Sequence, residues 1–290
     1  MRNVEAAQNL RKRGSVGEMQ VDDLTIAYWL LKGGPNTIVF LHGNSAGKEA
    51  FYQQFEGLAD TGYTLLALDL PGHGSSSNSL TPAADYTFPA FAALTARVLT
   101  ALNIKRPLIV GWSLGGHVVI EMAGQGTDLA GALICGTPPV GPGHTEDMQT
   151  AFIPSPAMAV TLKENPAPQE LSIYVAGLYG SLAPLPAAFP ALAQRMDGAV
   201  RSTIGDHWLS GKEGYDQRTV VAEWDKPLAI IHGDDDVFAS KDYIDALASR
   251  ALWNGGAVRM PGVGHAPFLE APEVFNRHLQ AFASDVFGER

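Results

Sequence analysis

The sequence has little cysteine, no long hydrophobic run and few positive charges. Its one cysteine, Cys135, cannot form an internal disulfide, and its apolar neighbours predict a buried, inert thiol. No apolar run approaches the roughly 18–20 residues that cross a bilayer. The 20 Lys and Arg residues are outnumbered by 30 Asp and Glu, which disfavours a nucleic-acid partner because phosphate binding needs clustered cations. These absences predict a cytoplasmic protein without a membrane or nucleic-acid partner.

The sequence does have enough apolar residues, 46% of 290, for a large core. Short apolar runs alternate with segments of helical period, which predicts an α/β fold with a mainly parallel sheet and helices on both faces. The expected strands are residues 24–31, 37–41, 64–68, 107–110, 131–135, 228–231 and 257–260. The expected helices are residues 50–59, 88–102, 114–123, 241–248 and 272–287.

The alternation stops between Thr137 and about Glu223, where strand-like runs disappear. Ten of the 19 prolines fall between Pro138 and Pro190. Because proline cannot donate the helical hydrogen bond, short interrupted helices are expected here. The sequence therefore predicts an N-terminal extension at residues 1–17, a core formed by 18–136 and 224–290, and an inserted helical cap at 137–223.

The strongest local motif surrounds Ser113, in Gly111-Trp112-Ser113-Leu114-Gly115-Gly116. It follows a buried strand-like run and precedes an apolar helix. A sharp strand-to-helix turn holds its central serine in a strained conformation, and glycines on either side avoid clashes. The hydroxyl then lies exposed at the carboxyl edge of the sheet, beside a helix N-terminus that favours an oxyanion. Ser113 is therefore the predicted nucleophile.

A serine hydroxyl needs a general base, and that base needs a group to orient it. His265 stands in a glycine-rich loop between the last expected strand and the last helix, and it is the predicted base. The acid should follow the preceding strand, where Asp234, Asp235 and Asp236 are adjacent. Asp236 is the predicted acid, and the other two are expected to bind turn backbone. No histidine is spaced to share a metal with them, so neither a metal nor a cofactor is expected.

The loop after the second strand of the core should supply a second oxyanion donor beside the N–H of Leu114. It reads His42-Gly43-Asn44-Ser45-Ala46-Gly47. Gly43 allows close backbone approach, and the N–H of Asn44 is the predicted donor. A phosphate-binding loop is the competing interpretation, but the spacing to Lys48 is one residue short and Glu49 replaces the required Ser or Thr.

Together these motifs resemble the α/β-hydrolase superfamily. In finer detail they resemble the metal-free, α/β-hydrolase type of N-acyl-homoserine lactonase. The segments that carry this resemblance are His42-Gly43-Asn44-Ser45, Asp69-Leu70-Pro71-Gly72-His73-Gly74, Gly111-Trp112-Ser113-Leu114-Gly115-Gly116-His117, Gly136-Thr137-Pro138-Pro139-Val140 and Gly264-His265-Ala266-Pro267-Phe268.

The resemblance implies that this chain opens the lactone ring through an acyl-Ser113 intermediate. It also implies that Asn44 and Tyr174 contact the substrate, with Trp112 and His117 near the pocket. One departure concerns the acid, which is Glu in that family and the shorter Asp236 here. The expected ligand is a small ester or lactone with an apolar acyl chain, bound beneath an apolar cap.

Other functions remain open at this point, because fold does not fix function. A carboxylesterase, or a hydrolase of carbon–carbon bonds, would use the same three residues. A hormone-receptor-like binding protein can also retain them. Dehalogenase and epoxide hydrolase chemistry is disfavoured because those enzymes place an Asp nucleophile where Ser113 stands. A metal-dependent lactonase would need a His-x-His-x-Asp-His segment, which the sequence lacks.

Overall fold

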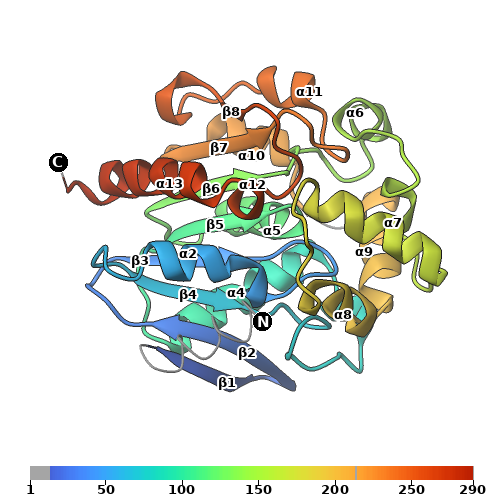
Figure 1. Ribbon diagram of the computed structural model, residues 1–290, viewed down its shortest axis with the longest axis horizontal. Coiled ribbons are helices and arrows are strands. Elements are labelled where there is room, and N and C mark those ends of the chain that lie inside the picture. Colours follow the sequence, from blue (N-terminus) through green and yellow to red (C-terminus); the bar gives the residue numbers. More distant parts are fainter. Residues whose placement is uncertain (1–13, 213, 290) are drawn as a thin grey trace.

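The computed structural model describes residues 14–212 and 214–289, and its centre is an eight-stranded sheet (Figure 1). The strand order is β1-β2-β4-β3-β5-β6-β7-β8. Strands β1, β2 and β4 pair antiparallel, and all pairings from β4 to β8 are parallel. The strands are β1 (Ser15–Val21), β2 (Leu24–Leu31), β3 (Thr37–Leu41), β4 (Thr64–Leu68), β5 (Leu108–Trp112), β6 (Gly131–Cys135), β7 (Leu228–Gly233) and β8 (Val258–Met260).

Helices cover both faces of this sheet, and each face buries its own hydrophobic cluster. One cluster includes Phe91 of α4 (Phe88–Ala101) and Val118 of α5 (Leu114–Gly124). The other includes Phe55 of α2 (Tyr52–Gly57) and Phe275 of α13 (Pro272–Phe287). Strands β3, β5 and β6 are fully buried, as expected for parallel strands covered on both faces. The predicted α/β fold with a mainly parallel sheet is confirmed.

The first strand was not predicted from the sequence. Most of β1 is exposed or half-buried, so it lacks the apolar run that marked the others. At Gly17 an added Cβ would lie 2.5 Å from the ring of Tyr28, so this aromatic side chain covers the glycine across the strand pair. The sheet therefore starts at Ser15, inside the segment expected as an extension. Residues 1–13 of that segment lie outside the described residues.

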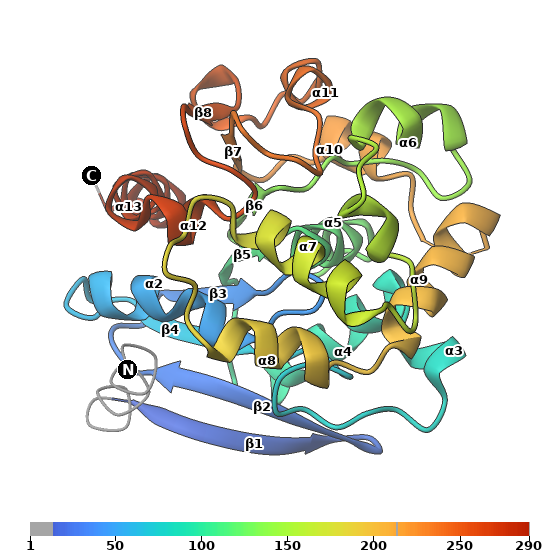
Figure 2. The same ribbon diagram turned by 45° about the vertical axis from the view of Figure 1, so that its right-hand side comes forward.

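The segment after β6 is helical, and much of it lies over the edge of the sheet where β5, β6 and β7 end (Figure 2). Its apolar residues from Leu171 to Tyr179 fall on one helix, α7, that begins at Pro168. The last helix, α10, packs against α5 and so belongs to a core layer, although it lies within the expected cap. The helices are α6 (Thr145–Ala151), η2 (Met158–Val160), α7 (Pro168–Tyr179), α8 (Ala188–Arg195), α9 (Ala199–Ser210) and α10 (Gln217–Glu223).

The remaining connections are short helical turns. The helix expected at 50–59 starts as a 3₁₀ turn and ends two residues early, and the one expected at 241–248 ends at Asp245. These elements are η1 (Lys48–Phe51), α3 (Pro82–Asp85), α11 (Lys241–Asp245), η3 (Trp253–Gly255) and α12 (Pro267–Glu270). Within 14–212 and 214–289, every helix is too short or too polar to cross a membrane.

Candidate active site

Ser113 lies at the turn between β5 and α5 with φ 53° and ψ −116°. A non-glycine residue rarely adopts positive φ, so the surrounding structure holds this strained geometry. An added Cβ at Gly111 would lie 2.5 Å from the carbonyl oxygen of Gly115, and one at Gly115 would lie 2.2 Å from that of Leu41. The tight turn therefore requires glycine on both sides of Ser113.

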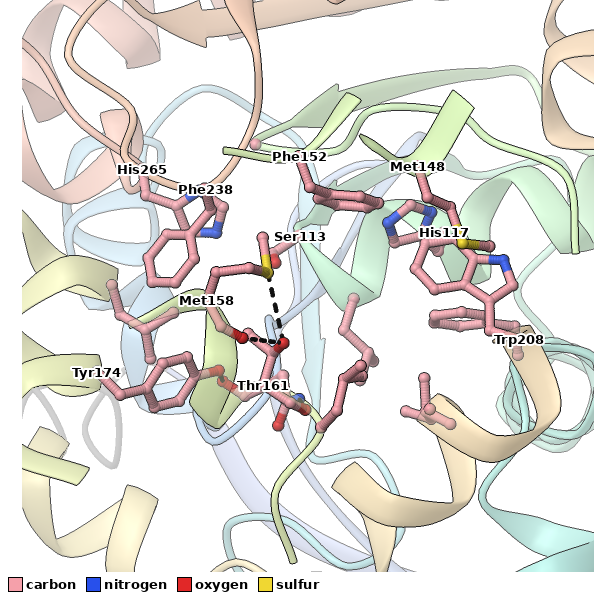
Figure 3. Close-up of a pocket in the computed structure, with 18 of the residues that line it drawn as sticks. Ser113, His117, Met148, Phe152, Met158, Thr161, Tyr174, Trp208, Phe238 and His265 are labelled. Atoms are coloured by element: carbon pink, nitrogen blue, oxygen red, sulfur yellow. Dashed lines mark hydrogen bonds between the residues drawn. The ribbon is translucent and has the colours of Figure 1, made fainter. Parts of the chain in front are cut away.

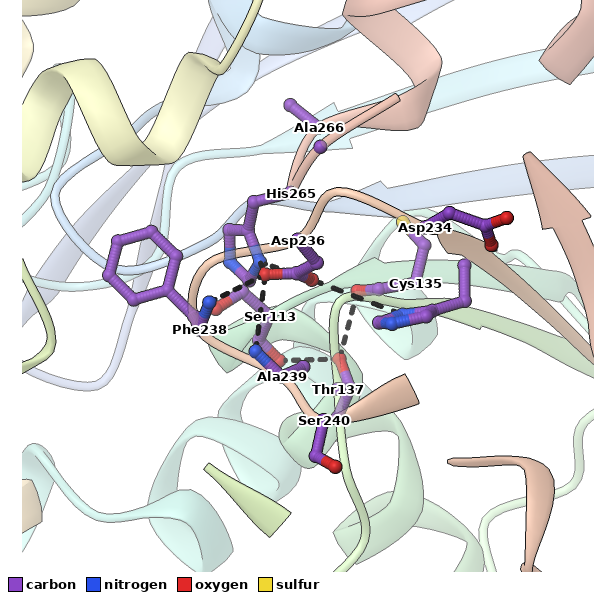
Figure 4. A network of polar contacts seen from close by, with 12 residues as sticks. Ser113, Cys135, Thr137, Asp234, Asp236, Phe238, Ala239, Ser240, His265 and Ala266 are labelled. Atoms are coloured by element: carbon purple, nitrogen blue, oxygen red, sulfur yellow. Dashed lines mark hydrogen bonds and ion pairs between the residues drawn. The ribbon is translucent and has the colours of Figure 1, made fainter. Parts of the chain in front are cut away.

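His265 and Asp236 form a buried pair beside this turn (Figure 4). His265 Nδ1 lies 2.8 Å from Asp236 Oδ2 and 3.0 Å from Oδ1. Because a carboxylate only accepts, Nδ1 carries the proton and Nε2 is left as the basic nitrogen. Burial alone would raise the pKa of Asp236, but the charge and hydrogen bond of His265, with His232 and backbone N–H donors, hold it below its ordinary value. The carboxylate is thus kept ionised beside the imidazole.

The other two aspartates of this loop have different surroundings. Asp234 forms an ion pair with Arg259 and not the expected contact with turn backbone, because the guanidinium lies beside it on β8. Asp235 is exposed, and its backbone N–H donates to the carbonyl of Val263. Of the three adjacent carboxylates, the structure therefore brings Asp236 to His265.

Trp112 and Glu270 fix the loop that carries His265 through three hydrogen bonds. Trp112 donates its indole N–H to the His265 carbonyl at 2.8 Å. Glu270 accepts from the backbone N–H of Gly264 at 3.0 Å and of Ala266 at 3.1 Å. These hydrogen bonds position the imidazole. Trp112 is distant from His265 in the sequence, and Glu270 stands at the end of the short helix α12 that follows it.

The predicted oxyanion loop lies directly against the turn at Ser113. An added Cβ at Gly43 would lie 3.2 Å from the Cβ of Ser113 and 3.0 Å from the Trp112 ring, so a side chain there would displace the loop. Within the described residues, the backbone N–H groups of Asn44 and Leu114 donate no hydrogen bond. Two such donors beside a nucleophile are available to an oxyanion.

Ser113, Leu114, Asn44 and His265 line one cavity of about 240 Å³ between the core and the helical segment above it (Figure 3). Most of its other walls are apolar. They come from Phe88, Gly136, Met148, Phe152, Met158, Leu162, Leu178, Ile204, Gly205, Trp208, Leu209 and Phe238, with Thr161, Tyr174 and His117 as polar members. A largely apolar cavity with a few fixed polar groups is typical of a small-molecule site.

Tyr174 and His117, which the resemblance places at the substrate site, both line this cavity. The Tyr174 hydroxyl donates to the carbonyl of Asn44 at 3.3 Å, and burial raises its pKa to about 12. His117 Nδ1 lies 2.7 Å from Gln217 Oε1, and Gln217 Nε2 donates to Glu121 at 3.2 Å. These hydrogen bonds fix the orientation of the Gln217 amide, so Nδ1 of His117 is the donor and Nε2 is an acceptor. Burial lowers the pKa of His117 to about 4, which keeps the ring neutral.

Trp112 and Gly43, the other residues expected at the substrate site, do not line this cavity. Trp112 is fully buried, does not line the cavity, and supports the His265 loop instead. The physical reason is that its ring packs in a core cluster against Tyr179 and Phe268. Gly43 also does not line the cavity, and contributes through its close approach to Ser113.

Several residues of this site carried no recognisable sequence signal. Glu270, Gln217, Phe152 and Trp208 belong to no motif and reach the site only through the tertiary fold. Phe238 could have been found from the sequence, since it follows Asp236 by two residues. In the structure its backbone N–H donates to the Asp236 carboxylate at 2.8 Å. Among the described residues, no group of three His, Cys, Asp or Glu side chains is arranged to hold a metal ion.

Comparison with known proteins agrees with this geometry. The model of the alpha/beta hydrolase family matches residues 38–278. A crystal structure of a mutant of N-acyl homoserine lactonase AidH, complexed with N-hexanoyl homoserine, is 32% identical, with a TM-score of 0.89, over 94% of this chain and 97% of that one.

Two of the curated relatives match over shorter regions. A 2-hydroxy-6-oxononadienedioate/2-hydroxy-6-oxononatrienedioate hydrolase of Paraburkholderia phymatum is 29% identical over 48% of this chain and 47% of its own length. The dihydrolipoyllysine-residue acetyltransferase component of the acetoin cleaving system of Cupriavidus necator is 37% identical over 36% of this chain, and the match spans 26% of that protein. The strained serine, the paired histidine and the family match place this chain in the alpha/beta hydrolase family, with close structural resemblance to an N-acyl homoserine lactonase.

Proposed function

We propose that this hydrolase opens the lactone ring of N-acyl-homoserine lactones. The observation that supports this most strongly is the similarity to AidH over nearly the full length of both chains, which includes the helical segment above the cavity. That segment supplies much of the apolar wall and is the part of the fold that selects the substrate. In the proposal, the apolar wall binds the acyl chain and the core presents Ser113 to the lactone carbonyl.

In the first half of the proposed reaction, Ser113 Oγ attacks the ring carbonyl while His265 Nε2 takes its proton. Asp236 keeps Nδ1 protonated and stabilises the resulting imidazolium. The N–H groups of Leu114 and Asn44 stabilise the tetrahedral oxyanion, and one such donor is worth about 3 kcal/mol in the transition state. The ring C–O bond then breaks, and His265 returns its proton to the departing alkoxide.

In the second half, water attacks the acyl-Ser113 ester as His265 takes its proton, and the serine leaves reprotonated. The product is the N-acyl-homoserine, with a carboxylate from the former carbonyl and the amide intact. Because the leaving alkoxide remains tethered to the acyl group, the covalent intermediate contains every atom of the lactone. An ordinary ester would leave only its acyl part on the enzyme.

In this proposal the other polar groups of the cavity bind the substrate. Asn44, Tyr174 and His117 line the space above Ser113, and Gly43 allows the loop to approach it. His117 is neutral and offers Nε2 as an acceptor, which suits a hydrogen-bond donor of the ligand such as an amide N–H.

The test is mass spectrometry of acyl-homoserine lactones of several chain lengths after incubation with the protein. Gain of one water with the amide intact supports the proposal, provided that Ser113→Ala abolishes it. Release of free homoserine lactone would indicate cleavage of the amide instead and would contradict the proposal.

A second candidate is a hydrolase of other esters or of carbon–carbon bonds. The partial similarity to the 2-hydroxy-6-oxononadienedioate hydrolase favours it, although the match leaves half of each chain uncovered. Turnover of p-nitrophenyl esters or of ring-fission products, with lactones unchanged, would select this candidate. Both candidates use the same nucleophile, and they differ in what the apolar cavity accepts.

A further inference from the structure

Arg201 on α9 is a buried cation. Only 3% of the residue is exposed. Its Nε donates to the Lys163 carbonyl at 2.8 Å, its Nη1 to Ser45 Oγ at 2.8 Å, and its Nη2 to the Glu164 carbonyl at 3.4 Å. In the part of the chain that the structure describes, this guanidinium forms no ion pair with a carboxylate. Burying an unpaired charge is costly, so its position calls for an explanation.

The contact with Ser45 joins Arg201 to the loop that carries the proposed oxyanion donor. Ser45 follows Asn44 and has a positive φ of 62°, a conformation that needs support from its surroundings. Its hydroxyl, which accepts from Arg201, donates to Asn44 Oδ1 at 3.0 Å. Arg201 therefore acts on both the backbone and the side chain of this loop through one hydroxyl.

Two further contacts join Asn44 to the same helical segment. Asn44 Nδ2 donates to the carbonyl of Thr161 at 3.2 Å, and its own carbonyl accepts from Tyr174 at 3.3 Å. Thr161, Tyr174 and Arg201 all lie within 137–223, while Asn44 and Ser45 belong to the core. The position of the Asn44 backbone N–H thus depends on contacts from outside the core as well as on those within it.

We propose that Arg201 is a positioning residue that holds the oxyanion loop in its active geometry by binding Ser45. The inference rests on the proposed role of Asn44 N–H in the function above. It adds that the oxyanion hole is complete only when the helical segment lies in the position seen here. A displacement of α9 would release Ser45, and the donor would move away from the substrate carbonyl.

This role predicts a distinct kinetic signature. An oxyanion donor acts mainly in the transition state, so its misplacement lowers kcat with little change in KM. A residue that only shaped the cavity wall would instead raise KM. We expect Arg201→Met to lower kcat about 10-fold, less than the loss of a donor outright. Arg201→Lys, which keeps the charge but not the fork of donors, should recover part of this loss.

The experiment measures kcat and KM for p-nitrophenyl butyrate and for an acyl-homoserine lactone with Arg201→Met, Ser45→Ala and the double variant. If both groups act through one contact, the double variant is no slower than the slower single variant. Independent, multiplying losses, or an increase of KM at constant kcat, would overturn the proposal. Ser202→Ala is the matched control. It removes a 2.8 Å hydrogen bond from the same helix to the Glu164 carboxylate, and it should leave kcat unchanged.

Thermal unfolding of each variant is measured to check that it folds. If Arg201→Met does not fold, Ser45→Ala alone tests the positioning role. It removes the shared hydroxyl and leaves the guanidinium and its carbonyl contacts in place. An unchanged kcat in Ser45→Ala would then overturn the proposal. The parent function is tested separately by Ser113→Ala. If Ser113→Ala is inactive but the Arg201 and Ser45 variants keep full kcat, only the positioning role is refuted. If Ser113→Ala stays active, the proposed function is refuted.

Discussion

The two walls of the cavity differ in what holds their side chains. On the core wall, Ser113 and His265 follow a strand end or occupy a tight loop, and buried Asp236 holds His265 from behind by a short hydrogen bond. On the opposite wall, Phe152, Leu162, Trp208 and Leu209 come from short helices and loops, and their side chains contribute mainly shape. In our account the core wall performs the chemistry and the other wall selects the substrate. Substitutions on the two walls should therefore have different kinetic effects.

The largest effect is expected for the nucleophile. Ser113→Ala should lower kcat about 10⁶-fold, because the covalent route is lost and only transition-state binding by the remaining groups persists. Steady-state hydrolysis of an acyl-homoserine lactone measures it, with thermal unfolding as the control for folding. Activity within 10-fold of the unmodified protein would place the chemistry elsewhere in the cavity.

The next effect concerns the acid. Asp236→Asn should lower kcat about 10⁴-fold near neutral pH, because an amide would favour the wrong tautomer of His265. Asp236→Glu should be far less harmful, since either carboxylate can orient an imidazole. The pH profile of kcat/KM for the three proteins is the measurement. If Asp236→Asn and Asp236→Glu lose the same activity, Asp236 serves packing and does not orient His265.

A smaller effect concerns stability at low pH. His117 has a pKa of about 4 in the folded protein because of burial, against about 6.5 in an unfolded chain. The unfolded state thus binds the proton first, and stability falls as the pH drops from about 6.5 to 4, by about 3 kcal/mol for this ring. His117→Gln should lose less stability across that range, as measured by urea unfolding. Parallel stability curves for the two proteins would show that this ring is not kept neutral by burial.

The smallest effect is expected on the apolar wall. Phe152→Leu should raise KM for long-chain lactones about 5-fold and change kcat less, because it removes apolar contact that ground and transition states share. A series of acyl chain lengths is the measurement. A large fall of kcat with constant KM would give this wall a part in the chemistry and remove the distinction between the two sides.

The same contrast explains how far the sequence could predict the structure. The parallel strands, the turn at Ser113 and the loop at His265 were predictable because each depends on a run of apolar residues followed by glycine at a fixed position. Strand β1 was missed because its exposed faces carry no such run. The choice of Asp236 among three adjacent carboxylates agrees with the geometry, in which Asp234 is paired with Arg259 instead.

Other residues could not be predicted because their partners are distant in the sequence. Arg201 contacts Ser45 across 156 positions, and Trp112 contacts the His265 carbonyl across 153. No local pattern encodes such pairs, and the resemblance implied only that Trp112 lies near the pocket, not that it supports the His265 loop. The polar contacts between the two walls are therefore visible only in the structure.

The most direct test of the central claim is the mass of the covalent intermediate. The protein is mixed with N-hexanoyl homoserine lactone, quenched rapidly in acid and digested for peptide mass spectrometry. Our account predicts an adduct on the peptide that contains Ser113, with the mass of the whole lactone, because ring opening leaves the alkoxide tethered. An adduct with the mass of the hexanoyl group alone, or one on a different residue, would contradict it.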